Sequence, residues 1–296
     1  MKFRTEYKAE PSRLHLDPTR PIVLVGSCFA DNIAGKMRES LWDAYNGLGT
    51  LYNPMSIAKV LDLMVFGIVD SNDIESSLFE ANGIVHSWLF DSHFSATSRE
   101  ECKKNIIESR TKLLESLEKS QMLIVTFGTA WCYSLQNINN DEEYIVANCH
   151  KMPSSMFSRR RVSVEEISKL WIDLCKRLQQ KYPDLTIAFT VSPVRHLKDG
   201  FEGNTLSKST LQLAVEQIRT KIENALYFPA YELVCDDLRD YRFYASDLVH
   251  PSDSAIEYIW EIFCQTFLDD HGMTMIKEGN KKYKRLIHRP IMRLGN

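Results

Sequence analysis

The chain has 296 residues, of which 44% are hydrophobic and 25% are charged, and its formal net charge is −3. These values are typical of a globular protein, and they exclude collagen-like, coiled-coil and intrinsically disordered chains. Because the 36 Lys and Arg residues nearly balance the 39 Asp and Glu residues, the charge indicates neither a nucleic-acid partner nor a membrane-surface protein.

Targeting signals and cysteine spacing favour a cytoplasmic location. Residues 1–15 are polar and charged, so we expect no signal peptide, and no apolar run approaches the roughly 18 residues of a membrane span. The seven cysteines are scattered without a C-x-x-C pair, which argues against a disulfide scaffold and a zinc ribbon. The sequence has no glycine-rich phosphate loop and no dinucleotide fingerprint, and we therefore expect no cofactor.

Short apolar runs alternate with amphipathic segments along the chain. Ser163 and Glu166 form a capping-box pattern, which marks the start of one of the helices. The predicted elements are, in chain order, a strand over 21–25, a helix over 31–42, a strand over 122–127, a helix over 163–181, a strand over 185–191, a helix over 207–224, a strand over 231–235 and a last helix over 254–267.

This alternation predicts an α/β fold with a mainly parallel sheet that is covered by helices on both faces. In such sheets ligands bind outside the carboxyl ends of the strands. Segments that follow predicted strands are therefore the places to look for chemistry. Three of them carry reactive side chains: 26–28, 128–131 and the loop that holds Asp247 and His250.

The predicted domain organisation is simple. Residues 1–268 are expected to form one domain, within which 43–121 carry fewer clear signals and elaborate the sheet. The tail 269–296 is rich in Lys and Arg, and it is interpreted as a solvated or subunit-covering extension. The oligomeric state is left open.

Gly26, Ser27 and Cys28 follow the first predicted strand. A glycine at the end of a buried strand allows a sharp turn into the next helix. The following residues then lie at a helix N-terminus, where free backbone N–H groups and the helix dipole favour a thiolate and can hold an oxyanion. The competing interpretation is that Ser27 is an N-cap and that Cys28 fills a small buried space.

Asp247 and His250 lie in the loop before the last predicted helix. A carboxylate three residues before an imidazole can orient it through Nδ1, which leaves the other nitrogen free to take a proton from a nucleophile. A lone D-x-x-H is a weak signal. Together with an early strand-Gly-Ser-Cys turn in an α/β chain, it indicates a catalytic site.

Six segments between about residue 20 and residue 268 carry a family pattern: LVGSCFADN, FGTAW, ANCHK, SPVRHLKDG, NTLSKS and YRFYASDLVHPS. In them the chain resembles the GSCFA family, which is grouped with the SGNH (GDSL-like) hydrolases and acyltransferases. The resemblance implies a flavodoxin-like, three-layer α/β/α sandwich with an esterase-type site. Those hydrolases carry a nucleophilic serine in Gly-Asp-Ser after the first strand, and here that place falls on Cys28. Their late Asp-x-x-His falls on Asp247 and His250.

The chain departs from the wider superfamily at the oxyanion site. The superfamily carries Gly-x-Asn-Asp after a middle strand, and the Asn side chain helps to hold the oxyanion, whereas residues 128–131 here read Gly-Thr-Ala-Trp. The backbone of Gly49 and the side chains of Asn53 and Asn148 are candidates to replace that donor. Losing one donor costs about 10²–10³ in rate if nothing compensates. A cysteine nucleophile also favours acyl transfer to another acceptor over simple ester hydrolysis.

The remaining candidates are interpreted as substrate contacts or as structural residues. Gly128 and Trp131 follow the second predicted strand, and His150 is either a second base, a substrate contact or an ordinary loop histidine. Arg195 follows the strand over 185–191, where it binds a carboxylate or phosphate of the substrate or forms a surface ion pair. The run Arg-Arg-Arg at 159–161 is interpreted as a solvated charge run.

Three functional hypotheses follow. The first is an enzyme, an esterase or acyltransferase of a small-molecule or glycan acyl substrate, in which His250 and Asp247 activate Cys28 or, in a variant, Ser27. The second is a binding module that recognises a glycan or an acylated ligand without turnover. The third and weakest uses Asp247, His250 and His93 as metal ligands, whereas the first two include no metal.

Overall fold

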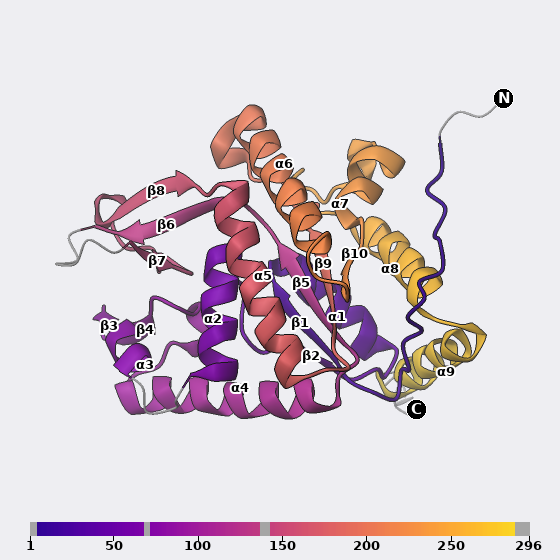
Figure 1. Ribbon diagram of the computed structural model, residues 1–296, viewed down its shortest axis with the longest axis horizontal. Coiled ribbons are helices and arrows are strands. Elements are labelled where there is room, and N and C mark those ends of the chain that lie inside the picture. Colours follow the sequence, from indigo (N-terminus) through magenta and orange to yellow (C-terminus); the bar gives the residue numbers. More distant parts are fainter. Residues whose placement is uncertain (1–4, 68–71, 137–142, 288–296) are drawn as a thin grey trace, which may run out of the picture.

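A computed structural model describes residues 5–67, 72–136 and 143–287, and its centre is a five-stranded sheet. The strand order is β10-β9-β5-β1-β2, and all neighbours pair in parallel (Figure 1). The strands of this sheet are β1 (Ile22–Gly26), β2 (Ala44–Tyr45), β5 (Met122–Phe127), β9 (Thr186–Val191) and β10 (Ala225–Tyr227).

Helices cover both faces of the sheet. The bounds of the longer helices are α1 (Cys28–Glu39), α2 (Pro54–Phe66), α4 (Arg99–Lys119), α5 (Val164–Lys181), α6 (Gly200–Arg219), α8 (Asp253–Phe267) and α9 (Asp270–Ile287). Shorter helical segments are α3 (Asn72–Ser77), α7 (Ala230–Glu232) and a π-helix (Leu233–Leu238).

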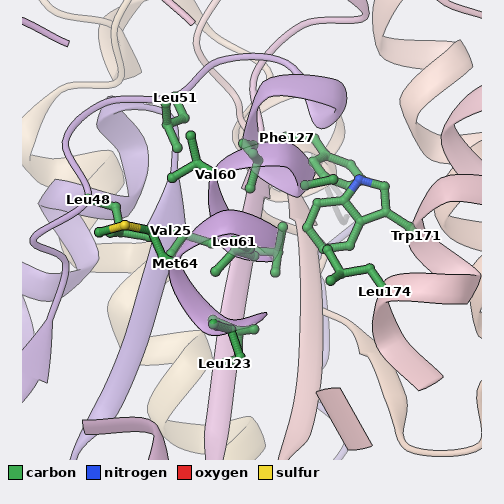
Figure 2. Close-up of a cluster of buried hydrophobic side chains, with 14 of the residues drawn as sticks. Val25, Leu48, Leu51, Val60, Leu61, Met64, Leu123, Phe127, Trp171 and Leu174 are labelled. Carbon is green, nitrogen blue, oxygen red and sulfur yellow. The ribbon is translucent and has the colours of Figure 1, made fainter. Parts of the chain in front are cut away.

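The alternation of side chains along β1 explains the three layers. Val23 and Val25 pack into a core with α2, α4, α5 and α6, whereas Ile22 and Leu24 pack into a second core with α1, α8 and α9. Successive residues of a strand point to opposite faces, so a strand that is apolar throughout requires cover on both sides. Figure 2 shows the first core, where side chains of α2 and Trp171 of α5 lie against β1 and β5.

Two small antiparallel sheets are added to this framework. One is the hairpin of β3 (Leu78–Ala81) and β4 (Ile84–Ser87), and the other has the order β7-β6-β8. Its strands are β6 (Trp131–Leu135), β7 (Tyr144–Val146) and β8 (Phe157–Arg161). In Figure 1 this second sheet projects from the body at the left, on the side opposite α8 and α9. Because β6 begins four residues after β5 ends, the sheet starts at the carboxyl edge of the central strands.

The predicted fold class is confirmed, since the structure is a three-layer α/β/α sandwich with a parallel sheet. The predicted strands near 22–26, 122–127 and 186–191 are present, and the Ser163 capping box opens α5 with both of its hydrogen bonds. The first helix, predicted from residue 31, already begins at Cys28.

The predicted strand over 231–235 is wrong. This segment is helical, and the edge strand of the sheet is β10, at 225–227. Leu233 and Val234 are adjacent and are both buried in the same core cluster, which a strand would not allow because it points neighbours to opposite faces. The helix predicted over 207–224 lies at 200–219 instead.

The last predicted helix is followed by another, α9, which packs on α1. A Cβ atom at Gly279 would collide with the carbonyl oxygen of Ser40, and the Ser40 Oγ lies 3.0 Å from the Oδ1 of Asn280. The predicted extension over 269–296 therefore contains a packed helix, while the domain boundary at 268 stays a prediction. In the described ranges we find no helix whose length and apolar character would let it cross a bilayer.

Candidate active site

A cavity of about 450 Å³ lies at the carboxyl ends of β1, β5 and β9. The turns after these strands contribute Cys28, Thr129 and Val194 to its lining, and His250 comes from the loop before α8. The small sheet adds a wall of aromatic and basic side chains, which are Trp131, Tyr133 and Arg159. The strand ends and the late loop, which are far apart in sequence, thus meet at one place.

The turn at Gly26 puts Cys28 into this cavity. Gly26 has a φ of +133°, and a Cβ there would collide with the Thr126 backbone of β5, so the position requires glycine. Ser27 is the N-cap of α1, its N–H donates to the Thr126 carbonyl at 3.2 Å, and its side chain is buried. Cys28 is the first helical residue and is the member of the pair that lines the cavity.

The Cys28 thiol lies in a mixed electrostatic environment. Burial, and next to it the charge of Asp31, raise its pKa. The backbone N–H groups of Cys28 and Phe29 at the helix N-terminus act in the opposite direction, as does Lys208. Because the net effect is a raised pKa, this thiol needs a base to become a nucleophile.

Asp247 and His250 form a hydrogen-bonded pair. The Nδ1 of His250 lies 2.7 Å from the Oδ2 of Asp247, and the Oδ1 of Asp247 accepts the N–H groups of Val249 and His250 at 2.9 and 3.0 Å. These bonds, first among them the one from the His250 N–H, lower the pKa of Asp247 to about 2. With Nδ1 held in this way, Nε2 is the nitrogen of His250 left to act on a substrate or a nucleophile.

Arg195 anchors the loop that carries this pair. Its backbone N–H donates to the Val249 carbonyl at 3.1 Å, and its Nη1 donates to the Leu248 carbonyl at 3.4 Å. The guanidinium also lies over the rings of Phe201 and Tyr241, at 5.2 and 5.6 Å from their centroids. Arg195 lines the cavity, as its prediction as a substrate contact requires, and it connects the cavity wall to the His250 loop.

The two candidate asparagines line the cavity, and both also stabilise their own loops. Asn53 caps α2, since its Oδ1 accepts the Ser56 N–H at 2.8 Å and its Nδ2 donates to the Ser56 Oγ at 2.9 Å. An amide nitrogen carries two hydrogens, so this contact uses one of the two Nδ2 donors. Asn148 accepts the His150 N–H through Oδ1 at 2.7 Å.

The two candidate glycines and His150 are outside the described lining of the cavity. The Gly128 N–H donates to the Tyr52 carbonyl at 2.8 Å, so it is already engaged. Gly49 has a φ of +72° and packs against the Asp91 carboxylate. His150 uses Nε2 on the carbonyls of Ser87 and Phe90, at 2.8 and 3.1 Å, which ties two loops together.

The structure also places at the site three residues to which the sequence analysis gave no site role. Arg159, interpreted as part of a solvated run, stacks on Trp131 at 4.3 Å and forms an ion pair with Asp199. His196 is mostly buried beside the cavity, and burial lowers its pKa to about 4. Lys208 is 1% exposed and donates to two backbone carbonyls next to the site. His196 lies in the segment SPVRHLKDG and Lys208 in the segment NTLSKS. Both segments contributed to the family resemblance, which gave no role to these two residues.

The hypothesis of a metal site is not supported by the described residues. Among them, no group of three or more His, Cys, Asp or Glu residues is arranged to hold a metal ion. His93 instead pairs with Asp91, with 3.0 Å between Nδ1 and Oδ2, and His250 pairs with Asp247.

Comparisons with known proteins identify one matching family model. The GSCFA family model matches residues 21–263 of the chain. A comparison with curated protein sequences found no match.

Three solved structures are similar over most of the chain. One is a candidate platelet activating factor from Streptococcus pneumonia, with a TM-score of 0.41, 10% identity and coverage of 82% of either chain. A second is a candidate GDSL-like lipase from Parabacteroides merdae, with a TM-score of 0.40, 10% identity and coverage of 90% of this chain and 100% of that one. A third, a Corynascus thermopiles carbohydrate esterase family 2 enzyme with its carbohydrate binding domain, has a TM-score of 0.37, 11% identity and coverage of 90% and 69%. Likenesses this remote assign no activity to the chain.

Proposed function

This chain belongs to the GSCFA family, and from that premise we propose that it is an acyl-ester hydrolase or acyltransferase with Cys28 as its nucleophile. The observation that carries the proposal is the meeting of Cys28 and His250 in one cavity, with Asp247 holding His250 at 2.7 Å. A nucleophile, a base and a carboxylate that orients the base are the parts that acyl transfer requires.

The proposed reaction begins with transfer of the Cys28 proton to the Nε2 of His250. The sulfur then attacks the ester carbonyl carbon, and the N–H of Cys28 at the start of α1 holds the oxyanion. The remaining Nδ2 hydrogen of Asn53 is the proposed second donor. When the intermediate collapses, the carbon–oxygen bond breaks, the leaving alcohol takes the proton from His250, and a thioester on Cys28 remains.

Water or a second alcohol then attacks the thioester while His250 takes its proton, and Cys28 is restored. The cavity volume of about 450 Å³ is within the range of small-molecule sites. Its wall of Trp131, Tyr133, Arg195 and Lys198 offers apolar faces together with positive charge. We therefore propose a small-molecule or glycan acyl ester as the substrate class.

A binding module is the second candidate function, and the segment 128–131 favours it. The asparagine that holds the oxyanion in the wider superfamily is replaced there. The aromatic side chains of the cavity wall can bind a sugar ring without catalysing a reaction on it. The variant His250→Ala separates the two functions. An enzyme loses about 10²–10⁴ in turnover of p-nitrophenyl acetate, whereas a protein without catalysis has no turnover for the variant to lose.

Two cysteines that line the same cavity provide the test of the nucleophile. We expect Cys28→Ala to abolish hydrolysis of p-nitrophenyl acetate, and we expect Cys149→Ala to retain it. Equal loss in both variants, or activity that survives in Cys28→Ala and disappears in Ser27→Ala, would contradict Cys28 as the nucleophile. Circular dichroism of each variant shows whether a loss comes from unfolding.

A further inference from the structure

Lys208 is an ionisable side chain in the interior of the protein. It lies on α6, is 1% exposed, and donates through Nζ to the carbonyl oxygens of Gly128 at 2.7 Å and Ser192 at 2.6 Å. These two carbonyls follow the last residues of β5 and β9. Both acceptors are neutral, and within the described ranges Lys208 forms no ion pair with a carboxylate. A buried ammonium without an anionic partner is costly, so such a residue calls for an explanation.

The charges that act to raise the pKa of Lys208 are those of Cys235 and, second, of Cys28, so the candidates for that anion are thiolates. Gly128, which accepts one Lys208 bond, packs against Ser27, since a Cβ at Gly128 would lie 3.2 Å from the Ser27 Cβ. The ammonium is therefore next to the turn that carries Cys28, and the charges of Lys208 and Cys28 act on each other.

Other groups face the same space. Cys235 of the π-helix also interacts with the Lys208 charge. His196, on the loop after β9, feels the same charge. The ring centroid of Tyr231 in α7 lies 5.9 Å from the Lys208 Nζ. Asp31 of α1 opposes a negative charge on Cys28. Lys208 is thus a positive group among thiols and neutral rings, and Cys28 is the thiol that opens into the cavity.

We propose that Lys208 is a positioning residue whose ammonium is the internal counter-charge of the Cys28 thiolate. Its neighbour Ser207 supports the same loop, because the Ser207 Oγ accepts the Ala130 N–H at 2.8 Å. The inference rests on the proposed function, in which Cys28 is the nucleophile. Lys208 lowers the energy of the thiolate that His250 generates, and it does so without contact with the substrate.

The charge of Lys208 makes the ionisation of Cys28 depend on pH through both groups. Burial lowers the pKa of Lys208 to about 7 and raises the pKa of Cys28. When two such groups interact, they lose protons in two steps that belong to the pair. Because Lys208 is the more acidic member of the pair, the first step, near pH 7, is mainly the loss of its proton, and only a minor population then has a Cys28 thiolate facing the ammonium. The second step, at higher pH, leaves thiolate and neutral amine.

The test is the rate at which iodoacetamide alkylates Cys28 between pH 5.5 and 10, followed by peptide mass spectrometry. We expect a small first rise in the wild-type rate near pH 7 and a larger rise at higher pH. Lys208→Gln keeps two N–H donors but removes the charge, so the first rise should vanish and the rate at pH 7 should fall by about tenfold. Lys36→Gln, on the same helix as Cys28 but paired with Glu39 and Glu257, should leave the profile unchanged.

A second variant covers the case in which Lys208→Gln does not fold. Lys208→Arg keeps a charge at every pH, so the low-pH reactivity of Cys28 should persist. A Lys208→Gln profile equal to that of the wild type would overturn the proposal. So would a Lys208→Arg profile that equals the wild-type profile at high pH, where only the wild type loses the charge. Alkylation needs no ester turnover, so this profile can be measured even if the proposed function is wrong. Two rises in a protein without esterase activity would contradict the proposed function and support the ion pair of Lys208 and Cys28.

Discussion

The two halves of the candidate site are built in different ways. Cys28 follows a strand whose five residues are all buried, and the turn before it is fixed by contact with the β5 backbone. Asp247 and His250 lie on a loop, and their side chains are 50% and 47% exposed. The first half is held by core packing, and the second is held by hydrogen bonds and by Arg195. A change in the first half should therefore act on folding, and a change in the second should act on the geometry of the base.

The largest expected effect is that of Gly26→Ala, which tests the packed half. The new Cβ would collide with the Thr126 carbonyl, and φ would stay at a value that alanine rarely adopts. We expect a loss of roughly 3 kcal/mol or more in the free energy of unfolding, measured by urea denaturation. Gly83→Ala is the matched control, because Gly83 also has a positive φ but no atom within 4 Å of a new Cβ. Equal losses in the two variants would show that close packing does not fix the turn.

A smaller effect is expected from the pH dependence of His196, which lines the same cavity as Cys28 and His250. Burial holds its pKa near 4 in the folded protein, and an unfolded histidine titrates near 6.5. Because the unfolded chain binds this proton more readily, stability is full above about pH 6.5 and is lost as the pH falls toward 4. The contribution is about 3 kcal/mol. His196→Gln should flatten the slope of unfolding free energy against pH over this range, and an unchanged slope would contradict the prediction.

The smallest effect is expected in the exposed half, from Leu248→Gly. Leu248 has a φ of +58°, which costs a non-glycine residue about 1 kcal/mol, and it is 48% exposed. Glycine removes that strain but loses more chain entropy on folding, by roughly 0.5–1 kcal/mol. The two terms nearly cancel, so the free energy of unfolding, measured by thermal denaturation, should change by no more than about 0.5 kcal/mol. A loss as large as that of Gly26→Ala would show that the loop is held as tightly as the turn.

The same difference explains what the sequence can predict. The strands at 22–26 and 122–127 are apolar on both faces, and the glycine at the end of each run favours a buried strand over a helical segment. The turn at Gly26 was predictable because a buried strand followed by glycine constrains the next residues. The segment around Leu233 and Val234 was not, since a short apolar run fits a strand and a buried helical turn equally well.

The walls of the cavity depend on contacts that sequence spacing does not reveal. Arg159 looks like one of three exposed arginines, yet pairing of β6 with β8 brings it onto Trp131. Lys208 looks like an ordinary residue of a helix, and only the packing of α6 on the strand ends makes it a buried charge. His150 seemed a candidate base, but its Nε2 is held by two carbonyls. Long-range packing decided each of these roles.

The central claim is that His250 activates Cys28 for attack on an acyl carbonyl. The most direct measurement is peptide mass spectrometry after a brief exposure to p-nitrophenyl acetate at pH 7, with wild type and His250→Ala side by side. An ordinary thiol, with a pKa near 8.5, reacts slowly at this pH. We predict an acetyl group on Cys28 in the wild type and little or none in the variant. An acetyl group on Ser27, or equal acetylation of Cys28 with and without His250, would contradict the account.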